Sequence, residues 1–184
     1  MKKLLGVAIV LMVVSIPVLS QDYSKAEVFG GYQYTRISFG HDTPGFNFNG
    51  WNAAVTGNVN HWLGVTGDFS GAYKSMNGDS LKQHTFLFGP TIASHSSGRF
   101  TPFAHALFGV AHLSASGSST PTVTVGGGSL NSFAMAFGGG LDVGGKKIAF
   151  RVGQFDYIYT RFGHDEGLGH QNDFRYSAGI VFRL

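Results

Sequence analysis

Hydrophobic and polar residues alternate along most of the chain after residue 21, in segments of about ten residues separated by clusters of Gly, Ser, Asn and Asp. Alternation with a period of two is the pattern of a strand with one apolar and one polar face. No stretch after residue 21 keeps the 3.6-residue period of an amphipathic helix. The pattern predicts an all-β protein with eight antiparallel strands, at residues 26–38, 51–59, 63–73, 84–94, 100–114, 132–143, 148–160 and 173–184.

The two faces of these strands carry different kinds of side chain. In the sixth strand, Phe133 and Phe137 lie on one face, whereas Asp142 and several small residues lie on the other. Small side chains replace the Lys and Glu that normally cover a solvated face. We therefore predict a barrel with its large apolar face outward toward lipid and its small polar face inward. The facing of residues 84–94 and 100–114 stays open, because apolar residues lie on both faces.

The predicted connections alternate in length along the chain. Short links are expected at residues 60–62, 95–99 and 144–147, and long ones at residues 39–50, 74–83, 115–131 and 161–172. Short periplasmic turns and long external loops are typical of an up-and-down outer-membrane barrel. This alternation predicts that both ends of the barrel domain lie on the periplasmic side.

The first twenty residues have the pattern of an export signal. Lys2 and Lys3 precede the apolar run 4–14, and Ser20 suits cleavage before Gln21. The run is too short for a membrane-spanning helix, which needs about 18 consecutive apolar residues. An uncleaved anchor is the alternative. The expected organisation is a signal peptide at residues 1–20 and one barrel domain at residues 21–184.

Composition narrows the classes of function. Charged residues make up 12% of the 184-residue chain, whereas about a quarter is usual in globular proteins, so the deficit fits a surface that faces lipid. Without Lys2 and Lys3, eleven of the thirteen basic residues remain against ten acidic ones. A nucleic-acid-binding surface is therefore not predicted. The absence of cysteine excludes disulfides, thiolate metal sites and a thiol nucleophile.

An inward polar face places charged residues in the lumen, which in an eight-stranded barrel is only wide enough for side chains. Unpaired buried charges are strongly disfavoured, so these residues are expected to pair with one another. Arg151 and Asp156 share a face only if their strand contains a bulge, for which Gly153 is the natural place. The predicted lumenal network consists of Glu27, Asp68, Asp142, Arg151, Asp156 and Arg175.

Aromatic residues are expected near the strand ends, where interfacial girdles anchor a barrel. They are Tyr32, Tyr34, Trp51, Trp62, Tyr73, Tyr157, Tyr159 and Tyr176. The phrase Tyr-x-Tyr-Thr-Arg occurs at residues 32–36 and 157–161, and each copy leads to Phe-Gly-His-Asp. We interpret this repeat as an interfacial anchor and predict no metal or other cofactor. The alternative is a divalent-metal site formed by His41, Asp42, His164, Asp165, Glu166 and His170.

Two histidines are candidates for catalysis. His112 and Ser114 lie on one face of a strand, as in a lipid A deacylase-type barrel, but no carboxylate lies nearby in sequence to orient the histidine. His105 is isolated on an otherwise apolar strand, which favours a lumenal hydrogen bond. The glycine runs 126–128 and 138–140 lack the Lys-Ser/Thr pair of a phosphate loop. No catalytic residue is therefore predicted.

Several segments carry a family resemblance that covers most of residues 21–184. They include Val28-Phe-Gly-Gly-Tyr-Gln-Tyr-Thr-Arg36, Asn60-His-Trp-Leu-Gly-Val-Thr-Gly-Asp-Phe69, Gly89-Pro90, Thr101-Pro-Phe103, Asp156-Tyr157 and the C-terminal Tyr-Ser-Ala-Gly-Ile-Val-Phe-Arg-Leu. These segments resemble the outer-membrane β-barrel family of OmpA/OmpX type.

The resemblance implies an eight-stranded, monomeric barrel in the bacterial outer membrane. It also implies insertion by the barrel-assembly machinery, with periplasmic chaperones, through an alternating C-terminal signal. That signal corresponds here to Tyr176, Ile180, Phe182 and Leu184. The chain ends in Leu184 where many members of the family end in Phe.

The expected function is that of a structural or surface-interaction barrel, with a plugged polar lumen and four extracellular loops. Its expected partners are outer-membrane lipid and lipopolysaccharide. A small, porin-like ion-conducting pore is the first alternative, and a lipid A-modifying hydrolase is the second.

Overall fold

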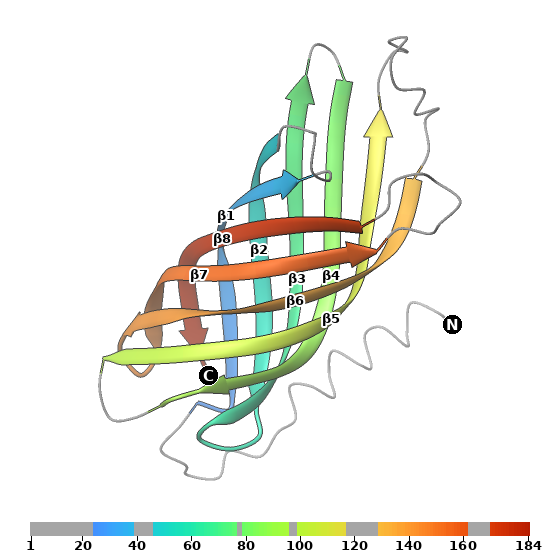
Figure 1. The fold of residues 1–184 in the computed structure, drawn as a ribbon. Coiled ribbons are helices and arrows are strands. Elements are labelled where there is room, and N and C mark those ends of the chain that lie inside the picture. The colour runs from blue at the N-terminus through green and yellow to red at the C-terminus, as the bar shows by residue number, and fades with distance from the viewer. Residues whose placement is uncertain (1–23, 39–45, 77–78, 96–98, 117–128, 162–169) are drawn as a thin grey trace, which may run out of the picture.

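Eight antiparallel strands close into a barrel, in which neighbours in sequence are neighbours in space and β1 pairs with β8 (Figure 1). The protein's structure is a computed structural model that describes residues 24–38, 46–76, 79–95, 99–116, 129–161 and 170–184. The strands are β1 (Ala26–Ser38), β2 (Phe46–Asn58), β3 (Leu63–Met76), β4 (Asp79–Ala93), β5 (Phe100–Ser116), β6 (Ser129–Gly144), β7 (Ile148–Arg161) and β8 (His170–Arg183). No helix in these described ranges is long and apolar enough to cross a membrane.

The number and order of the predicted strands are confirmed, but several strands are longer than predicted. The additional residues lie at the loop end of the barrel, opposite the turn end that carries the C-terminus (Figure 1). The largest difference separates β3 from β4, where Met76 pairs with Asp79 and only residues 77 and 78 intervene. The prediction of a long connection at residues 74–83 is therefore wrong. Its sequence, Asn77-Gly78, is typical of a two-residue hairpin connection, so the signal was present.

Side chains alternate between the outside and the lumen along every strand. Phe137 and Phe182 are 47% and 48% exposed, whereas Asn52 and Asp142 are each 1% exposed. Strands β4 and β5 follow the same rule, with Phe86, Phe88 and Phe108 outside and Leu87 and Leu107 inside. The barrel is thus apolar outside and polar over much of its interior, as predicted.

The predicted bulge in β7 is present. The register with β6 and β8 shifts across Val152 and Gly153, and the shift turns both Arg151 and Asp156 toward the lumen. An extra residue in one strand has this effect because it reverses the facing of every side chain beyond it.

Apolar side chains also face the interior. Three clusters lie among the inward side chains, and most of their members are Ala, Leu or Phe. The clusters contain Phe29, Ala54, Ala149 and Val181; Leu87, Leu107, Ala111, Ala134, Ala136 and Ile158; and Phe48, Ala72 and Leu81. The lumen therefore holds apolar clusters as well as the polar and charged side chains.

Candidate functional site

The centre of the lumen is occupied by Arg175 of β8, which is fully buried between two carboxylates. Its Nη1 atom lies 2.7 Å from Asp68 Oδ1, and its Nε and Nη2 atoms lie 2.8 and 2.7 Å from Asp156 Oδ2. Asn52 adds a hydrogen bond of 2.8 Å to Asp68 Oδ2. Because Asp68 lies on β3 and Asp156 on β7, the guanidinium joins strands that are not neighbours in the barrel wall. The interaction therefore bridges β3, β7 and β8 across the lumen.

A second contact to Asp156 comes from His105 of β5. His105 Nε2 lies 2.7 Å from Asp156 Oδ1, across the intervening strand β6. Gly138 stands between them in the register, and a Cβ at that position would lie 2.0 Å from Asp156 Oδ1. The missing side chain leaves the space through which His105 reaches the carboxylate.

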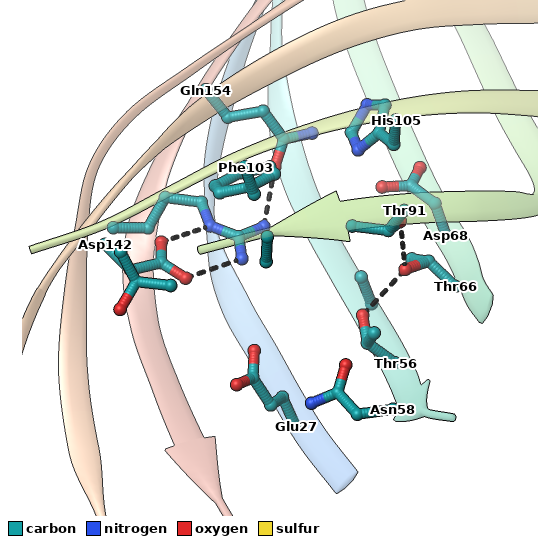
Figure 2. Close-up of a pocket in the computed structure, with 14 residues that line it drawn as sticks. Glu27, Thr56, Asn58, Thr66, Asp68, Thr91, Phe103, His105, Asp142 and Gln154 are labelled. Carbon is teal, nitrogen blue, oxygen red and sulfur yellow. Dashed lines mark hydrogen bonds and ion pairs between the residues drawn. The ribbon is translucent and has the colours of Figure 1, made fainter. Parts of the chain in front are cut away.

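The polar chain continues from Asp156 to Arg151. Gln154 donates to Asp156 Oδ2 over 2.7 Å and accepts from Arg151 Nη1 over 2.7 Å. Arg151 in turn makes two parallel hydrogen bonds to Asp142, of 2.8 and 3.0 Å, shown as dashed lines in Figure 2. Such paired contacts are stronger and more directional than single ones. Five of the six predicted lumenal charges thus lie in one connected network.

Two aromatic rings enclose the Arg151 guanidinium. Its carbon lies 4.4 Å from the centroid of Phe29 and 4.1 Å from that of Phe103, which places the cation between the two ring faces. Cation–π attraction is strengthened when the cation is shielded from water. In a strand, whose side chains alternate with a period of two, Phe29 lies on the same face as Glu27 and Gln33. The inward position of Phe29 could therefore have been predicted from the sequence.

A small cavity lies beside this network. The lumenal cavity bounded by Asp68, His105, Asp142 and Arg151 has a volume of about 20 Å³ (Figure 2). A space of that size holds about one water molecule. We call the residues Asp68, His105, Asp142, Arg151, Gln154, Asp156 and Arg175, with the rings Phe29 and Phe103, the lumenal plug.

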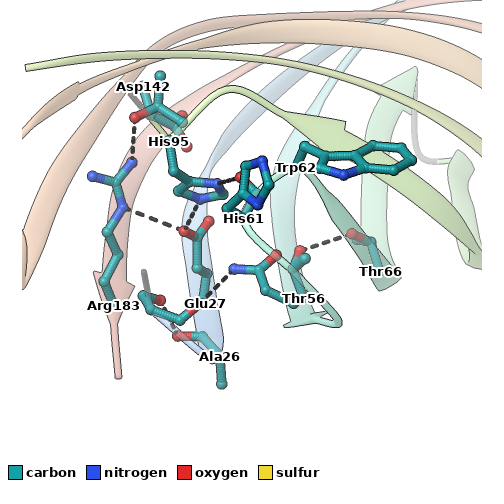
Figure 3. Close-up of polar contacts among 12 residues, drawn as sticks. Ala26, Glu27, Thr56, His61, Trp62, Thr66, His95, Asp142 and Arg183 are labelled. Carbon is teal, nitrogen blue, oxygen red and sulfur yellow. Dashed lines mark hydrogen bonds and ion pairs between the residues drawn. The ribbon is translucent and has the colours of Figure 1, made fainter. Parts of the chain in front are cut away.

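The sixth predicted charge, Glu27, belongs to a separate group at the turn end of the barrel. Its Oε1 atom lies 2.9 Å from His95 Nε2 and 3.4 Å from Arg183 Nε, as Figure 3 shows. His95 Nδ1 lies 3.0 Å from the carbonyl oxygen of His61, and Arg183 Nη2 donates to Thr101 over 3.1 Å. These contacts tie two turns and both terminal strands together. We call Glu27, His95 and Arg183 the terminal latch.

The hydrogen bond to Glu27 raises the pKa of His95 above its ordinary value. A carboxylate and a carbonyl can only accept, so both ring nitrogens of His95 donate and the ring is an imidazolium in this geometry. Sequence reasoning missed His95 and Arg183, because neither lies close to Glu27 along the chain.

The predicted interface aromatics point outward, and several are hydrogen bonded. Tyr32 donates to Asn49 over 2.6 Å, Tyr157 to Asn172 over 2.7 Å and Tyr176 to the carbonyl of Val152 over 2.9 Å. Tyr32 and Tyr176 lie near the middle of their strands, so the prediction that all these residues lie at strand ends is wrong. For Tyr176 the difference follows from the extension of β8 to His170, whereas Tyr32 was already central in the predicted range 26–38.

The other candidate sites fall into two groups. His41, Asp42, His164, Asp165 and Glu166, and the side chain of His170, lie outside the described residues. In the part of the chain that is described, no three His, Asp or Glu residues are placed to hold a metal ion. His112 Nδ1 lies 2.7 Å from Asn131 Oδ1, so its described partner is Asn131 and not Ser114.

Known structures share this architecture. No protein-family model matches the chain, and no curated protein matches it in sequence. The structure of Ail, the attachment invasion locus protein of Yersinia pestis, is similar with a TM-score of 0.60 and 18% identity, over 87% of this chain and 99% of that one. A further Ail structure contains the heparin analogue sucrose octasulfate.

Two other similar structures come from different bacteria. Neisserial surface protein A matches with a TM-score of 0.66 and 12% identity, over 89% of this chain and 100% of that one. OprG from Pseudomonas aeruginosa matches with a TM-score of 0.51 and 12% identity, over 91% and 99%. The chain therefore has the fold of the eight-stranded outer-membrane barrels.

Proposed function

We propose that this chain, which has the fold of the eight-stranded outer-membrane barrels, is itself an outer-membrane barrel that holds surface loops on a plugged scaffold and carries out no catalysis. The observation that carries the proposal is the pattern of outward side chains. Counted from the turn end, these are apolar for about ten residues of each strand, which is the length that crosses a membrane. Beyond that distance the outward residues become polar.

On adjacent strands, the outward side chains change from apolar to polar at matching heights in the barrel wall. In β4, the outward residues Ile92, Phe88 and Phe86 are 52%, 66% and 50% exposed, and His84 follows them. In β5, Phe108 and Val110 precede His112. In a soluble barrel so continuous an apolar belt would be exposed to water, which promotes aggregation. Lipid contact removes that cost, because a closed barrel leaves no backbone edge unpaired in hydrocarbon.

The lumenal plug supports a scaffold rather than a pore. A conducting lumen needs a continuous wet path, whereas here Arg175 and Arg151 span the interior with paired carboxylates and about 20 Å³ of free volume beside them. The ascending strands β1, β5 and β7 end at Ser38, Ser116 and Arg161, at the loop end of the barrel. Ail, which shares the fold, is named the attachment invasion locus protein. We extend to this chain only that general role of surface contact.

The same proposal includes the route to the membrane. Residues 1–20 are removed as a signal peptide, and residues 21–184 enter the membrane as a monomer through periplasmic chaperones and the barrel-assembly machinery. The outward-facing Ile180, Phe182 and Leu184 support this, since they form the alternating apolar row of the last strand. Tyr176 belongs to the same face.

Heat-modifiable gel migration tests the proposal. The full-length protein is produced in a Gram-negative host, the outer-membrane fraction is extracted with detergent, and boiled and unboiled samples are compared. The proposal predicts recovery in that fraction and a faster unboiled band. Phe137→Arg places a charge in the lipid-facing belt and should reduce the fast band, whereas the matched Lys147→Ala change at an exposed turn should not. Recovery of the wild-type protein in the soluble periplasm, without a band shift, would instead favour a lipocalin-like soluble barrel.

A further inference from the structure

A group of polar side chains lies on the outer surface of β3, β4 and β5, directly above the apolar belt. His84 of β4 stands opposite His112 of β5 in the register, and Lys82 stands opposite Tyr73 of β3 and Ser114 of β5. All of these residues are at least partly exposed. They form two adjacent rows on the lipid-facing side, just where the outward residues cease to be apolar.

Hydrogen bonds fix the orientation of the two histidines. Trp51 Nε1 donates to the Tyr73 hydroxyl over 3.1 Å, and that hydroxyl lies 3.3 Å from His84 Nε2. The indole can only donate, whereas the Tyr73 hydroxyl can donate to His84 Nε2 or accept from it, according to the tautomer of the ring. In the tautomer that accepts from Tyr73, the ring hydrogen is on His84 Nδ1, which is then a further donor.

His112 is oriented from the other side. Its Nδ1 donates to Asn131 Oδ1 over 2.7 Å, because an amide oxygen can only accept. This leaves His112 Nε2, which is a donor in the imidazolium form. Among the described residues, no acceptor lies within hydrogen-bonding distance of the exposed Lys82 amine. Lys82 Nζ, His84 Nδ1 and His112 Nε2, on neighbouring strands, therefore make no hydrogen bond within the described protein.

The contacts between Trp51, Tyr73 and His84 require a glycine at position 71. This glycine stands opposite both Trp51 and His84 in the register, and a Cβ there would lie 2.8 Å from Trp51 Nε1 and 2.8 Å from the Tyr73 hydroxyl. Any larger residue would separate the hydrogen-bonded rings that orient His84.

We propose that Tyr73, Lys82, His84 and His112 form a binding site for a phosphate group of the outer-leaflet glycolipid, lipid A. The inference rests on the membrane placement proposed above. Lys82 supplies a full positive charge, and His84 and His112 in their imidazolium forms supply directional N–H donors, which is the chemistry that binds phosphate. Phe86, Phe88 and Val110 lie immediately below on the same face, where they pack against acyl chains. A lipid, unlike free phosphate, satisfies both parts of this surface.

A transition-metal ion is the other occupant that two opposed histidines suggest. The Lys82 amine beside them disfavours a cation, and the described residues provide no third ligand of the kind such ions prefer. The phosphate group is therefore the better match in charge.

Native mass spectrometry of the folded barrel, released from dodecyl maltoside micelles, tests the site. Bisphosphorylated lipid A and the same lipid without its phosphates are titrated separately. The wild-type protein should reach half occupancy at a concentration of the phosphorylated lipid about tenfold lower than that of the dephosphorylated lipid. The variant K82Q/H84Q/H112Q should lose this preference, and Lys82→Arg should retain it. The control K146Q/K147Q, which changes exposed lysines at the opposite end, should behave as wild type.

Folding is checked in each sample by the unboiled gel band. A wild-type barrel that folds in the outer membrane but binds both lipids equally would overturn the inference and leave the proposed function standing. An equal loss in K146Q/K147Q, or a lipid preference that appears only with added zinc, would also overturn it. A wild-type protein absent from the membrane would refute the proposed function itself.

Discussion

His105 Nε2 and Asp156 Oδ1 lie 2.7 Å apart, although β6 runs between the strands that carry them. The contact is possible because Gly138 occupies the position between them in the register. A glycine in a lumen-facing position thus determines which charged residues can pair. The lumenal plug therefore depends on the space left by glycine as well as on its charged side chains.

Gly138→Ala should destabilise the barrel by about 1–3 kcal/mol, the usual cost of forcing extra volume into a packed interior. The new Cβ would lie 2.0 Å from Asp156 Oδ1 and 2.4 Å from the carbonyl oxygen of Phe155. Urea unfolding in lipid vesicles measures the free energy. The matched change Gly30→Ala, at a position with nothing within 4 Å of the new Cβ, should have little effect. Equal values for the two variants would contradict the packing described here.

Arg175→Met should cost roughly 3–5 kcal/mol in the same unfolding measurement, because it leaves two buried carboxylates without their cation. Asp68 and Asp156 are each 1% exposed. Combining the change with Asp68→Asn and Asp156→Asn should restore part of the stability, since the unpaired charges are then removed. The exposed Arg36→Met serves as the control. Failure of the combined variant to recover any stability would show that Arg175 acts by packing and not by charge.

Arg151→Ala combined with Arg175→Ala should open a path through the lumen. The first change removes the guanidinium between the Phe29 and Phe103 rings, and the second removes the guanidinium that joins Asp68 to Asp156. Planar-bilayer recording should detect discrete openings that are rare or absent in the wild-type protein. Lys147→Ala, at an exposed turn, is the matched control. Wild-type conductance as large as that of the variant would refute a closed lumen.

The terminal latch should make stability depend on pH. The pKa of His95 in the folded protein is raised above its ordinary value of 6.5 by the hydrogen bond to Glu27, beside Arg183. The protonated ring therefore stabilises the fold below pH 6.5, and this contribution is lost as pH rises through the folded-state pKa. Wild type should thus exceed His95→Gln in free energy of unfolding by more at about pH 5.5 than at about pH 8.5.

His61→Gln provides the comparison for this experiment, because His95 contacts the backbone of His61 and not its side chain. That variant should keep the wild-type pH dependence. A difference between wild type and His95→Gln that stays constant with pH would show that His95 contributes without its charge.

Much of the fold could be predicted because period two determines the facing of every residue in a strand. The alternation of Phe133 and Phe137 with small residues established both the strand and its outer face. The strand ends were less predictable, since the sequence cannot show how far strands continue beyond a membrane. The hairpin between Met76 and Asp79 was an exception, because its Asn-Gly sequence carried a signal.

The lumenal site was predictable in its members but not in its pairing. Burial of charge required partners for Arg175, but the choice of Asp68, 107 residues away in sequence, depends on how the closed barrel aligns distant strands. For the same reason, the sequence alone did not show that His95 and Gln154 belong to these polar groups. Their roles depend on contacts across the lumen, which leave no local pattern in the sequence.

The central claim, that the apolar face contacts lipid, is tested most directly by spin-label accessibility. Because the chain contains no cysteine, single labels can be placed at Phe137, Val110 and Phe182, with an exposed turn residue, Lys146, as the control. In reconstituted vesicles, labels in the belt should collide with lipid-soluble oxygen and not with a water-soluble nickel chelate, whereas the Lys146 label should show the reverse. Collision of all the belt labels with the nickel chelate would contradict the account.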